Sequence, residues 1–477
     1  MSPCAILTAL KGSFYKEITM SNTITTKLGR ISGVDMGSYT VFKGVPYAKP
    51  PVGELRFKAP QPLEPWEGVF EAKKFNDAPL QQLSTDDPLW GPEFYSEKEW
   101  LRAQSEDCLY INIWVPNEIF ENAANSESDP ASSSSNTGKK LPVAFWIHGG
   151  AFLSGYSTEK EFDGEAYCKR GVILVSVEYR CNIFGFLAHP LLTAESPDHT
   201  SGNYGILDQI AALKWVYENI GSFGGDPESI TVFGQSAGAM SVQTLISSPL
   251  TDKMIARAIM QSGGGYNGGL SRDMLLSEQE KYGEMFMEVA GISTLEELRS
   301  LSADKILSLL GPFMGKVFPI AKGLFLTPVI DDHLLTDGYD SLIEKGSIKD
   351  IPYLLGSTKN DITVTEEMLK EGGFSPVYNG CTNFSKKLED LSRKPAYVYY
   401  FAHDLPGDDA GAFHSSELWY MFGTLERCWR PFTEADKKLS EKMLDYWTNF
   451  MKTGDPNGEG LEKWGPYRAD DEFIMEF

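Results

Sequence analysis

Hydrophobic and polar residues alternate along the chain in blocks that predict strands separated by helices. Short apolar runs bounded by turn residues are typical of buried strands and occur at residues 108–115, 142–147, 171–179 and 230–233. Residues 208–220 instead place apolar side chains at every third or fourth position, which is the spacing of a helix. Strands that alternate with helices predict a mostly parallel central sheet with helices on both faces.

Two segments interrupt this pattern and are predicted to lie outside the packed core. Residues 1–24 hold a short apolar run without a basic stretch before it, so we expect a loosely ordered N-terminal extension that starts at Met1 or Met20. Residues 117–140 are polar and low in complexity, which predicts a flexible surface insertion between two core strands. The remainder, residues 25–477, is predicted to form one domain.

A third segment, residues 270–350, is rich in Leu, Met, Glu and Lys and is predicted to be helical. Thr294 and Glu297 have the spacing of a capping box at the start of a helix. We expect this segment to form a helical cap. Some of its Met and Phe side chains would line a substrate pocket, although packing in the core is the commoner role of such residues: Met285, Phe286, Met287, Phe313, Met314 and Phe318.

Residues Gly234–Gly238 read Gly-Gln-Ser-Ala-Gly and stand between a predicted strand and a predicted helix at 239–246. This context is typical of a nucleophile elbow, a strained turn that lifts a serine hydroxyl out of the sheet. Side chains at the two glycines would collide with the neighbouring strand and helix. The pattern therefore predicts Ser236 as a nucleophile and the Ala237 N–H as a donor to developing negative charge. An ordinary glycine-rich connection is the alternative.

A second strand end carries His148, Gly149 and Gly150 directly after the apolar run at 142–147. Glycines in this position expose backbone N–H groups without a side chain in the way. They suit the second half of an oxyanion hole, as in the corresponding loop of esterases. The alternative is an ordinary β-turn.

The six histidines of the chain limit the choice of a general base. The order serine, acid, histidine leaves only His333, His403 and His414 after the elbow. His333 comes too early to leave room for an acid, and His403 ends a strand, where it fits a surface residue. His414 lies in a loop from which an imidazole could reach Ser236, and histidine titrates near neutral pH.

The acid that would orient this base is harder to select, because the chain has 66 acidic residues. Asp361 follows a buried strand and a polar turn, which is where the acid of a catalytic triad belongs. A solvated loop position is the alternative for any single aspartate.

These motifs belong to a sequence that resembles the type-B carboxylesterase, or cholinesterase-like, branch of the α/β-hydrolases over nearly its whole length. Residues 42–57 resemble the N-terminal signature of that family, and residues 105–112 resemble its second signature. Residues 202–209 and 223–227 precede the elbow as they do in the family. The resemblance implies an α/β-hydrolase fold with a helical cap insertion.

The resemblance also implies a role for individual residues. The nucleophile, acid and base of the family fall on Ser236, Asp361 and His414. The other implied roles are oxyanion donors at Gly149, Gly150 and Ala237, polar partners near the base at Ser262, Gln235 and Glu417, and a structural ion pair of Arg56 with Glu106. Such a reaction needs neither a metal nor an organic cofactor.

Three positions depart from the pattern of the family. The acid is usually Glu, and Asp361 is one methylene shorter, so the loop or the imidazole must shift closer. Gln235 stands where many members have Glu, so the site lacks one negative charge and the case for a cationic substrate is weaker. Cys108 occupies the usual disulfide position, but the matching upstream residues, 78–82, contain no cysteine.

Charge and cysteine content restrict the partners and the location. The formal net charge of −23 opposes binding to nucleic acids and to anionic membranes. No run of eighteen apolar residues predicts a transmembrane helix. The six cysteines form neither close pairs nor a metal-binding spacing, so we expect a reducing cytoplasm and no metal. The oligomeric state is not specified by the sequence.

Together these features predict a serine carboxylic-ester hydrolase that acts on small to medium esters through an acyl-enzyme. Its activity is expected to rise as His414 loses its proton with increasing pH. A feruloyl-like aromatic ester, an amide or a carbamate is an alternative substrate, because selectivity lies in the cap and loop walls. A non-catalytic, cholinesterase-like interaction protein is an alternative of another class, although all three triad positions hold competent residues.

Overall fold

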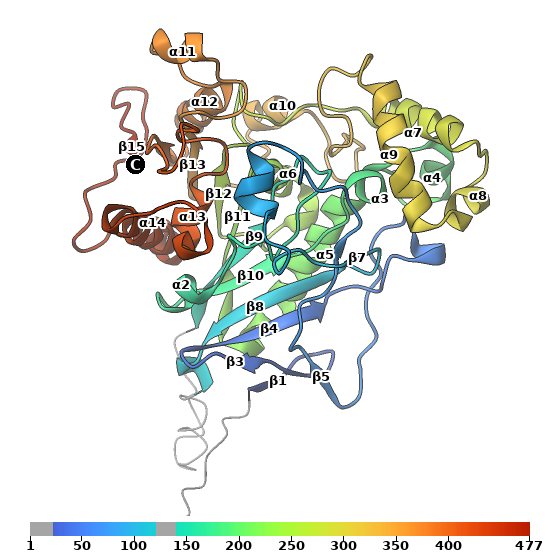
Figure 1. Ribbon diagram of the computed structural model, residues 1–477, viewed down its shortest axis with the longest axis horizontal. Helices are drawn as coiled ribbons and strands as arrows, with labels where there is room; N and C mark the ends of the chain where they lie inside the picture. Colours follow the sequence, from blue (N-terminus) through green and yellow to red (C-terminus); the bar gives the residue numbers. More distant parts are fainter. Residues whose placement is uncertain (1–21, 121–139) are drawn as a thin grey trace, which may run out of the picture.

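The computed structural model describes residues 22–120 and 140–477, and a twisted, mostly parallel sheet lies at its centre (Figure 1). Within the described residues this sheet has ten strands. From one edge to the other they are β15 (Met475–Glu476), β14 (Tyr397–Phe401), β13 (Tyr353–Thr358), β12 (Arg257–Gln261), β11 (Gly225–Gln235), β9 (Leu141–Ile147), β10 (Ile173–Val177), β8 (Tyr110–Pro116), β4 (Tyr39–Pro46) and β3 (Val34–Asp35). Strands β15 to β10 run parallel, and β8, β4 and β3 continue the sheet antiparallel, which confirms the predicted sheet.

The sheet has a hydrophobic core on each face, because successive side chains of a strand point to opposite sides. In β9, Val143 and Phe145 pack into one core, whereas Ala144 and Trp146 pack into the other. Both faces are covered, so the central strands are apolar throughout rather than alternating. This burial explains why the sequence shows continuous apolar runs.

Helices cover both faces. Helices α5 and α6 contribute to the first core, and α13 and α14 contribute to the second. Figure 1 shows α7, α8 and α9 grouped at one end of the molecule, away from α13 and α14. The helices are α2 (Glu165–Cys168), α3 (Asn182–Phe186), α4 (Pro190–Glu195), α5 (Tyr204–Asn219), α6 (Ala237–Ser247), α7 (Leu276–Ala290), α8 (Leu295–Ser300), α9 (Ala303–Val317), α10 (Tyr339–Glu344), α11 (Glu366–Lys370), α12 (Pro376–Asp390), α13 (Leu418–Phe422) and α14 (Glu434–Thr453).

Short strands and single helical turns complete the fold. The strands are β1 (Thr23–Thr25), β2 (Arg30–Ser32), β5 (Val69–Glu71), β6 (Ala78–Pro79) and β7 (Gln104–Ser105). The turns of 3-10 helix are Gly53–Leu55, Ile220–Phe223, Pro249–Thr251 and Leu425–Arg427, and Gly91–Tyr95 form one turn of π-helix.

The predicted N-terminal extension and surface insertion fall largely on residues 1–21 and 121–139, which lie outside the described residues. Strand β1 already pairs with β2 from Thr23, because the Ile24 side chain is buried in the core.

The segment predicted to form a cap, residues 270–350, contains α7, α8, α9 and α10. The capping box is confirmed, since Thr294 accepts a hydrogen bond from the Glu297 N–H while the Glu297 carboxylate binds the Thr294 N–H. Within the described part of the chain, no helix combines the length and the apolar character needed to cross a membrane.

Candidate active site

The turn from β11 into α6 places Ser236 in a strained conformation at the end of a central strand. Its φ and ψ are 56° and −125°, a region that residues with a side chain rarely adopt. A Cβ atom on Gly234 would lie 2.5 Å from the Gly238 carbonyl carbon, and one on Gly238 would lie 2.0 Å from the Ile147 carbonyl oxygen. Both flanking positions therefore require glycine, and the turn has the geometry predicted for a nucleophile elbow.

An aspartate–histidine pair lies beside this turn. His414 Nδ1 is 2.5 Å from Asp361 Oδ1, and both side chains are buried. The Asp361 carboxylate also accepts hydrogen bonds from the Thr358 and Ile362 N–H groups at 3.1 and 2.7 Å. These contacts fix the carboxylate on the loop after β13, so Asp361 reaches the imidazole despite its shorter side chain.

Burial raises the pKa of Asp361, but the charge of His414, the hydrogen bonds from His414 and the Ile362 N–H, and the nearby polar Ser262 side chain outweigh burial and lower it overall. The carboxylate is therefore ionised and accepts the Nδ1–H of the imidazole. This arrangement leaves Nε2 as the free acceptor of the ring.

His414 Nε2 faces the Gln235 side-chain amide, whose nitrogen is 3.2 Å away. Because Gln235 precedes Ser236, this contact directs Nε2 toward the elbow. Among the described residues Gln235, and not Ser236, is the hydrogen-bond partner of Nε2. Trp90 packs against the imidazole edge-on, with ring centroids 6.1 Å apart.

The loop after β9 lies against the serine. A Cβ atom on Gly149 would be 3.1 Å from Ser236 Cβ, and Gly150 has a φ of +105°, which favours glycine. In the described part of the chain, the N–H groups of Gly149, Gly150 and Ala237 donate no hydrogen bond. Free backbone N–H groups are the kind of donor that stabilises an oxyanion.

Further polar residues support the base from behind. Glu417 is buried, and burial raises its pKa to about 7, while the positive charge of His414 opposes this shift. Gln261 holds the Glu417 carboxyl through a 3.4 Å hydrogen bond. Ser262 lies close enough to Asp361 to lower its pKa, as described above.

Arg56 and Glu106 form a bidentate ion pair away from the serine, with N–O distances of 2.5 and 2.6 Å. Arg56 also donates to the Leu301 carbonyl at 2.6 Å, and thereby joins the N-terminal region to the end of α8.

The other candidates from the sequence have structural partners. His403 contacts Asp436 at 2.8 Å, and His333 lies 3.9 Å from Asp198. Asp331 accepts hydrogen bonds from the His333 and Leu334 N–H groups and so shapes a turn. Across residues 22–120 and 140–477, no cluster of three or more His, Cys, Asp and Glu side chains is arranged to hold a metal ion.

Several residues of the segment predicted to form a cap, two of them from the Met and Phe set named above, approach the loop after β9. Met314 and Phe318 line a small apolar cavity together with Ala151 and Leu153. In contrast, Phe286 and Phe313 are fully buried and pack against each other edge to face at 5.4 Å. Only part of the listed Met and Phe set therefore lies near the site, as is common for such residues.

The sequence did not predict that Trp90 and its neighbours pack beside His414. Glu93 lies on the same turn as Trp90 and forms a buried ion pair with Arg430 at 3.0 Å. The two residues are 337 positions apart in the chain, so the spacing of motifs carries no signal for this pair.

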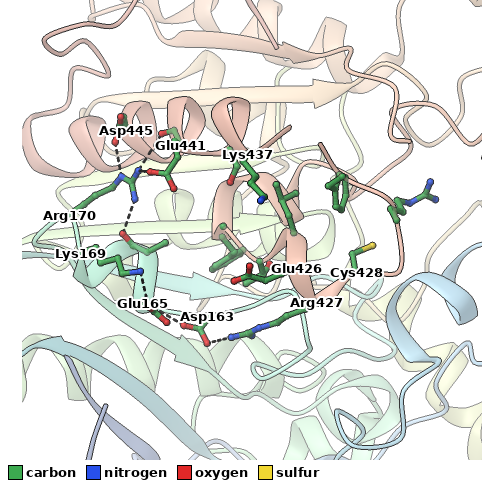
Figure 2. A pocket seen from close by; sticks show the side chains of 18 of the residues that line it. Asp163, Glu165, Lys169, Arg170, Glu426, Arg427, Cys428, Lys437, Glu441 and Asp445 are labelled. Atoms are coloured by element: carbon green, nitrogen blue, oxygen red, sulfur yellow. Dashed lines mark hydrogen bonds and ion pairs between the residues drawn. The ribbon is translucent and has the colours of Figure 1, made fainter. Parts of the chain in front are cut away.

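A surface cavity of about 840 Å³ lies elsewhere, between α2, the segment after α13 and α14 (Figure 2). Figure 2 shows that its charged side chains pair with one another: Arg170 contacts Glu441 and Asp445, and Arg427 contacts Asp163. None of the three predicted triad residues lines it. We therefore place the chemistry at the elbow.

The fold, with its serine elbow at the end of a central strand beside a buried aspartate–histidine pair, defines an α/β-hydrolase. The chain belongs to the carboxylesterase family, whose model matches residues 20–379 and 375–477. A para-nitrobenzyl esterase of Bacillus subtilis is 31% identical over 94% of this chain and 93% of its own length. A fumonisin B1 esterase of Sphingopyxis macrogoltabida is 37% identical, covering 95% of this chain and 85% of the relative.

Solved structures also support membership of the carboxylesterase family. A thermophilic PNB esterase superposes with a TM-score of 0.80 at 30% identity and covers 96% of both chains. The protein is thus a carboxylesterase, an enzyme that hydrolyses carboxylic esters, and small-molecule esters are its substrate class. The comparisons favour neither the non-catalytic alternative nor the aromatic-ester, amide and carbamate alternatives.

Proposed function

We propose that Ser236, His414 and Asp361 form the catalytic triad of this esterase. The observation that carries the proposal is the buried 2.5 Å contact between His414 Nδ1 and Asp361 Oδ1 beside the serine elbow. The contact fixes the imidazole tautomer in which Nε2 is a proton acceptor, as a general base requires.

In the proposed reaction, His414 Nε2 removes the Ser236 hydroxyl proton as the serine oxygen attacks the ester carbonyl. Gly149, Gly150 and Ala237 donate their N–H groups to the oxyanion of the tetrahedral intermediate. The protonated imidazole then delivers its proton to the leaving alcohol, which yields the acyl-enzyme. Water, deprotonated by the same imidazole, releases the acid and restores the serine.

Serine and histidine must first approach each other. Because Gln235 occupies Nε2 at 3.2 Å, formation of the serine–histidine bond requires the Gln235 amide to give way. Catalytic hydrogen bonds are often loose in a free enzyme and tighten when the substrate binds.

We further propose that the substrates are small to medium esters. Met314, Phe318 and Leu153 form an apolar wall together with Ala151, which directly follows the proposed oxyanion donor Gly150. The relatives named para-nitrobenzyl esterase and fumonisin B1 esterase act on the esters that their names state, and support an ester substrate here.

We also propose that the enzyme works in the reducing cytoplasm. The five cysteines of the described residues are free thiols, including Cys108, and four of them are buried. Fractionation of cells that express the full chain, with alkylation of free thiols before lysis, tests this location. Recovery of the enzyme outside the cell would contradict it.

The first experiment measures hydrolysis of p-nitrophenyl esters, from acetate to octanoate, and of one hydroxycinnamate ester. Substitution of Ser236 by alanine is expected to lower kcat by roughly 10⁴-fold or more and to abolish fluorophosphonate labelling, because the nucleophile is lost. The profile over chain length measures the size of the acyl site.

Ser247→Ala is the matched control. Ser247 ends the same helix, and its buried hydroxyl has no hydrogen-bond partner among the described residues, so its loss should leave activity unchanged. If Ser236→Ala keeps the activity of the wild type, the proposed triad is refuted.

A further inference from the structure

Two buried polar atoms face each other directly behind the proposed oxyanion loop. His148 Nε2 and Glu178 Oε2 are 3.9 Å apart, and the two side chains are 0% and 1% exposed. Among the described residues neither atom has a hydrogen-bond partner. Buried polar atoms without a partner are rare and costly, so two that face each other indicate a shared proton.

The other nitrogen of His148 shows which atom is the acceptor. Nδ1 lies 2.9 Å from the Gly149 carbonyl oxygen, so Nδ1 carries a hydrogen and donates it. Burial lowers the pKa of His148 to about 4, although the bond to Gly149 opposes this shift. The ring is therefore neutral at pH 7, and Nε2 presents a lone pair.

Glu178 supplies the matching donor. Its Oε1 accepts hydrogen bonds from the Ser157 N–H and hydroxyl at 3.0 and 2.8 Å. Burial raises the pKa of Glu178 to about 8, against the opposing effect of these two bonds. The carboxyl is thus protonated at pH 7, and Oε2 bears the proton toward His148 Nε2. If Glu178 Oε2 and His148 Nε2 come about 1 Å closer, they form a normal hydrogen bond.

This contact matters because of the peptide planes of the loop. In a trans peptide the C=O and N–H groups point in opposite directions. The Gly149 carbonyl shares its plane with the Gly150 N–H, so the bond from His148 Nδ1 orients that N–H. Likewise, the Tyr179 hydroxyl donates to the His148 carbonyl at 3.0 Å and thereby orients the Gly149 N–H. Both proposed oxyanion donors are held from behind.

The neighbouring side chains leave the His148 imidazole ring almost no other position. Tyr179 stacks on it with ring centroids 4.3 Å apart. A Cβ atom on Gly155 would lie 2.6 Å from both His148 Nδ1 and the Gly149 carbonyl oxygen. The ring is thus confined by packing, and Glu178 supplies the donor that matches the lone pair of its Nε2.

We propose that Glu178 is a positioning residue, which uses its carboxyl proton to hold the His148 tautomer that orients the Gly150 N–H toward the reacting carbonyl. The proposal rests on the proposed role of Gly149 and Gly150 as oxyanion donors. When Glu178 loses its proton, the carboxylate and the Nε2 lone pair are two acceptors that repel each other. The loop is then released, and activity falls at alkaline pH.

The other titratable and charged groups that interact with Glu178 are Glu159, Arg102, Tyr47, Tyr156, Tyr179, Cys108 and Cys181. Burial raises the pKa of the Tyr47 phenol and of both thiols well above their usual values, so these groups stay protonated in the relevant range. Burial also raises the pKa of Glu159 to about 8, which makes Glu159 the group to test against Glu178.

The experiment compares the pH profiles of kcat for wild type, Glu178→Gln and Glu159→Gln. Glutamine keeps an acceptor for Ser157 and a donor for His148 but does not ionise. Relative to its own value at pH 7, wild type should fall about tenfold by pH 9.5, whereas Glu178→Gln should stay level. Glu159→Gln should keep the alkaline fall. An alkaline fall in Glu178→Gln equal to that of wild type would overturn the proposal.

Glu178→Met, which removes the donor without adding charge, should lower kcat about tenfold or more with little change in KM, because transition-state donors are misplaced. Ser236→Ala is measured in parallel. If it is inactive while Glu178→Gln keeps the alkaline fall, only the role of Glu178 is refuted; if it is active, the triad itself is refuted.

A direct measurement does not depend on activity. In wild type labelled with ¹⁵N-histidine, the His148 Nε2 signal should shift over the same alkaline range as the fall in kcat, with His148→Gln providing the assignment. A His148 signal that is constant over this range contradicts the proposal.

Discussion

Gln235 shows how one side chain adjusts the base at the residue scale. Its amide nitrogen donates to His414 Nε2 at 3.2 Å, and a donor in this position disfavours a proton on Nε2. Many cholinesterase-like proteins have a carboxylate here, which would attract that proton.

Substitution of Gln235 by glutamate is expected to move the acid limb of kcat/KM to higher pH by about one unit, because the new carboxylate stabilises the imidazolium. Activity at pH 6 should fall about tenfold while the alkaline side changes little. The pH profile on p-nitrophenyl acetate measures this shift.

Gln235→Met is the control, since it removes the donor without adding charge and should move the limb less. An acid limb that stays in place in Gln235→Glu would show that the contact with Nε2 has no influence on the base.

The sequence predicted Ser236, His414 and Asp361 as a triad because each stands in a local motif or in the chain order of the family. It did not reveal that Gln235 occupies Nε2 or that Glu178 faces His148, since such contacts depend on rotamers and on packing between distant segments. Glu159, Lys160 and Glu161 are three consecutive charged residues, yet all three side chains are buried.

At the element scale, the elbow depends on the close approach of α6 to β9. A Cβ atom at Gly238 would lie 2.0 Å from the Ile147 carbonyl oxygen, which is backbone and does not move without shifting the strand. A Cβ atom added in the same way at Gly311, within α9, would have no neighbouring atom within 4 Å. The two helical glycines thus make a matched pair.

Gly238→Ala is expected to lower the free energy of unfolding by about 1–3 kcal/mol or more, since the added methyl group is forced against backbone. Gly311→Ala should raise it by about 0.5–1 kcal/mol, because alanine has the better helix propensity and fills open space. Urea unfolding followed by circular dichroism measures both. Equal effects of the two substitutions would contradict this account of the elbow.

The strands at 142–147 and 230–233 were predictable because burial on both faces leaves continuous apolar runs. Their ends were less predictable: β11 begins at Gly225, and its register against β9 shifts between Gly225 and Ile230. The polar residues of that stretch carry no strand pattern. Pairing of short strands such as β1 with β2 also depends on distant partners that a local pattern does not contain.

At the scale of the whole molecule, acidic residues act in two different ways. Most contribute to the net charge of −23 at the surface, where salt screens their repulsion. Glu159 and Glu178 are instead buried, and burial raises the pKa of each to about 8, with the surrounding hydrogen bonds opposing it. In the unfolded chain both carboxyls titrate near pH 4.3.

The sign of the effect on stability follows from this difference. Between about pH 5 and 8 the folded protein holds protons that the unfolded chain has lost, so the free energy of unfolding falls as pH rises. We expect a slope on the order of 1 kcal/mol per pH unit for each carboxyl, until both ionise near pH 8. Urea midpoints at 0.2 M salt, which screens the surface charges, measure the slope.

The double substitution Glu159→Gln with Glu178→Gln removes both buried titrations and should flatten the dependence between pH 5 and 8. Glu366→Gln is the matched control, because the Glu366 side chain is 88% exposed and its loss should leave the slope unchanged. A slope that persists in the double variant would assign the pH dependence to surface charge. The same buried carboxyls would then have no measurable influence on folding, and the loop behind the serine would owe its order to packing alone.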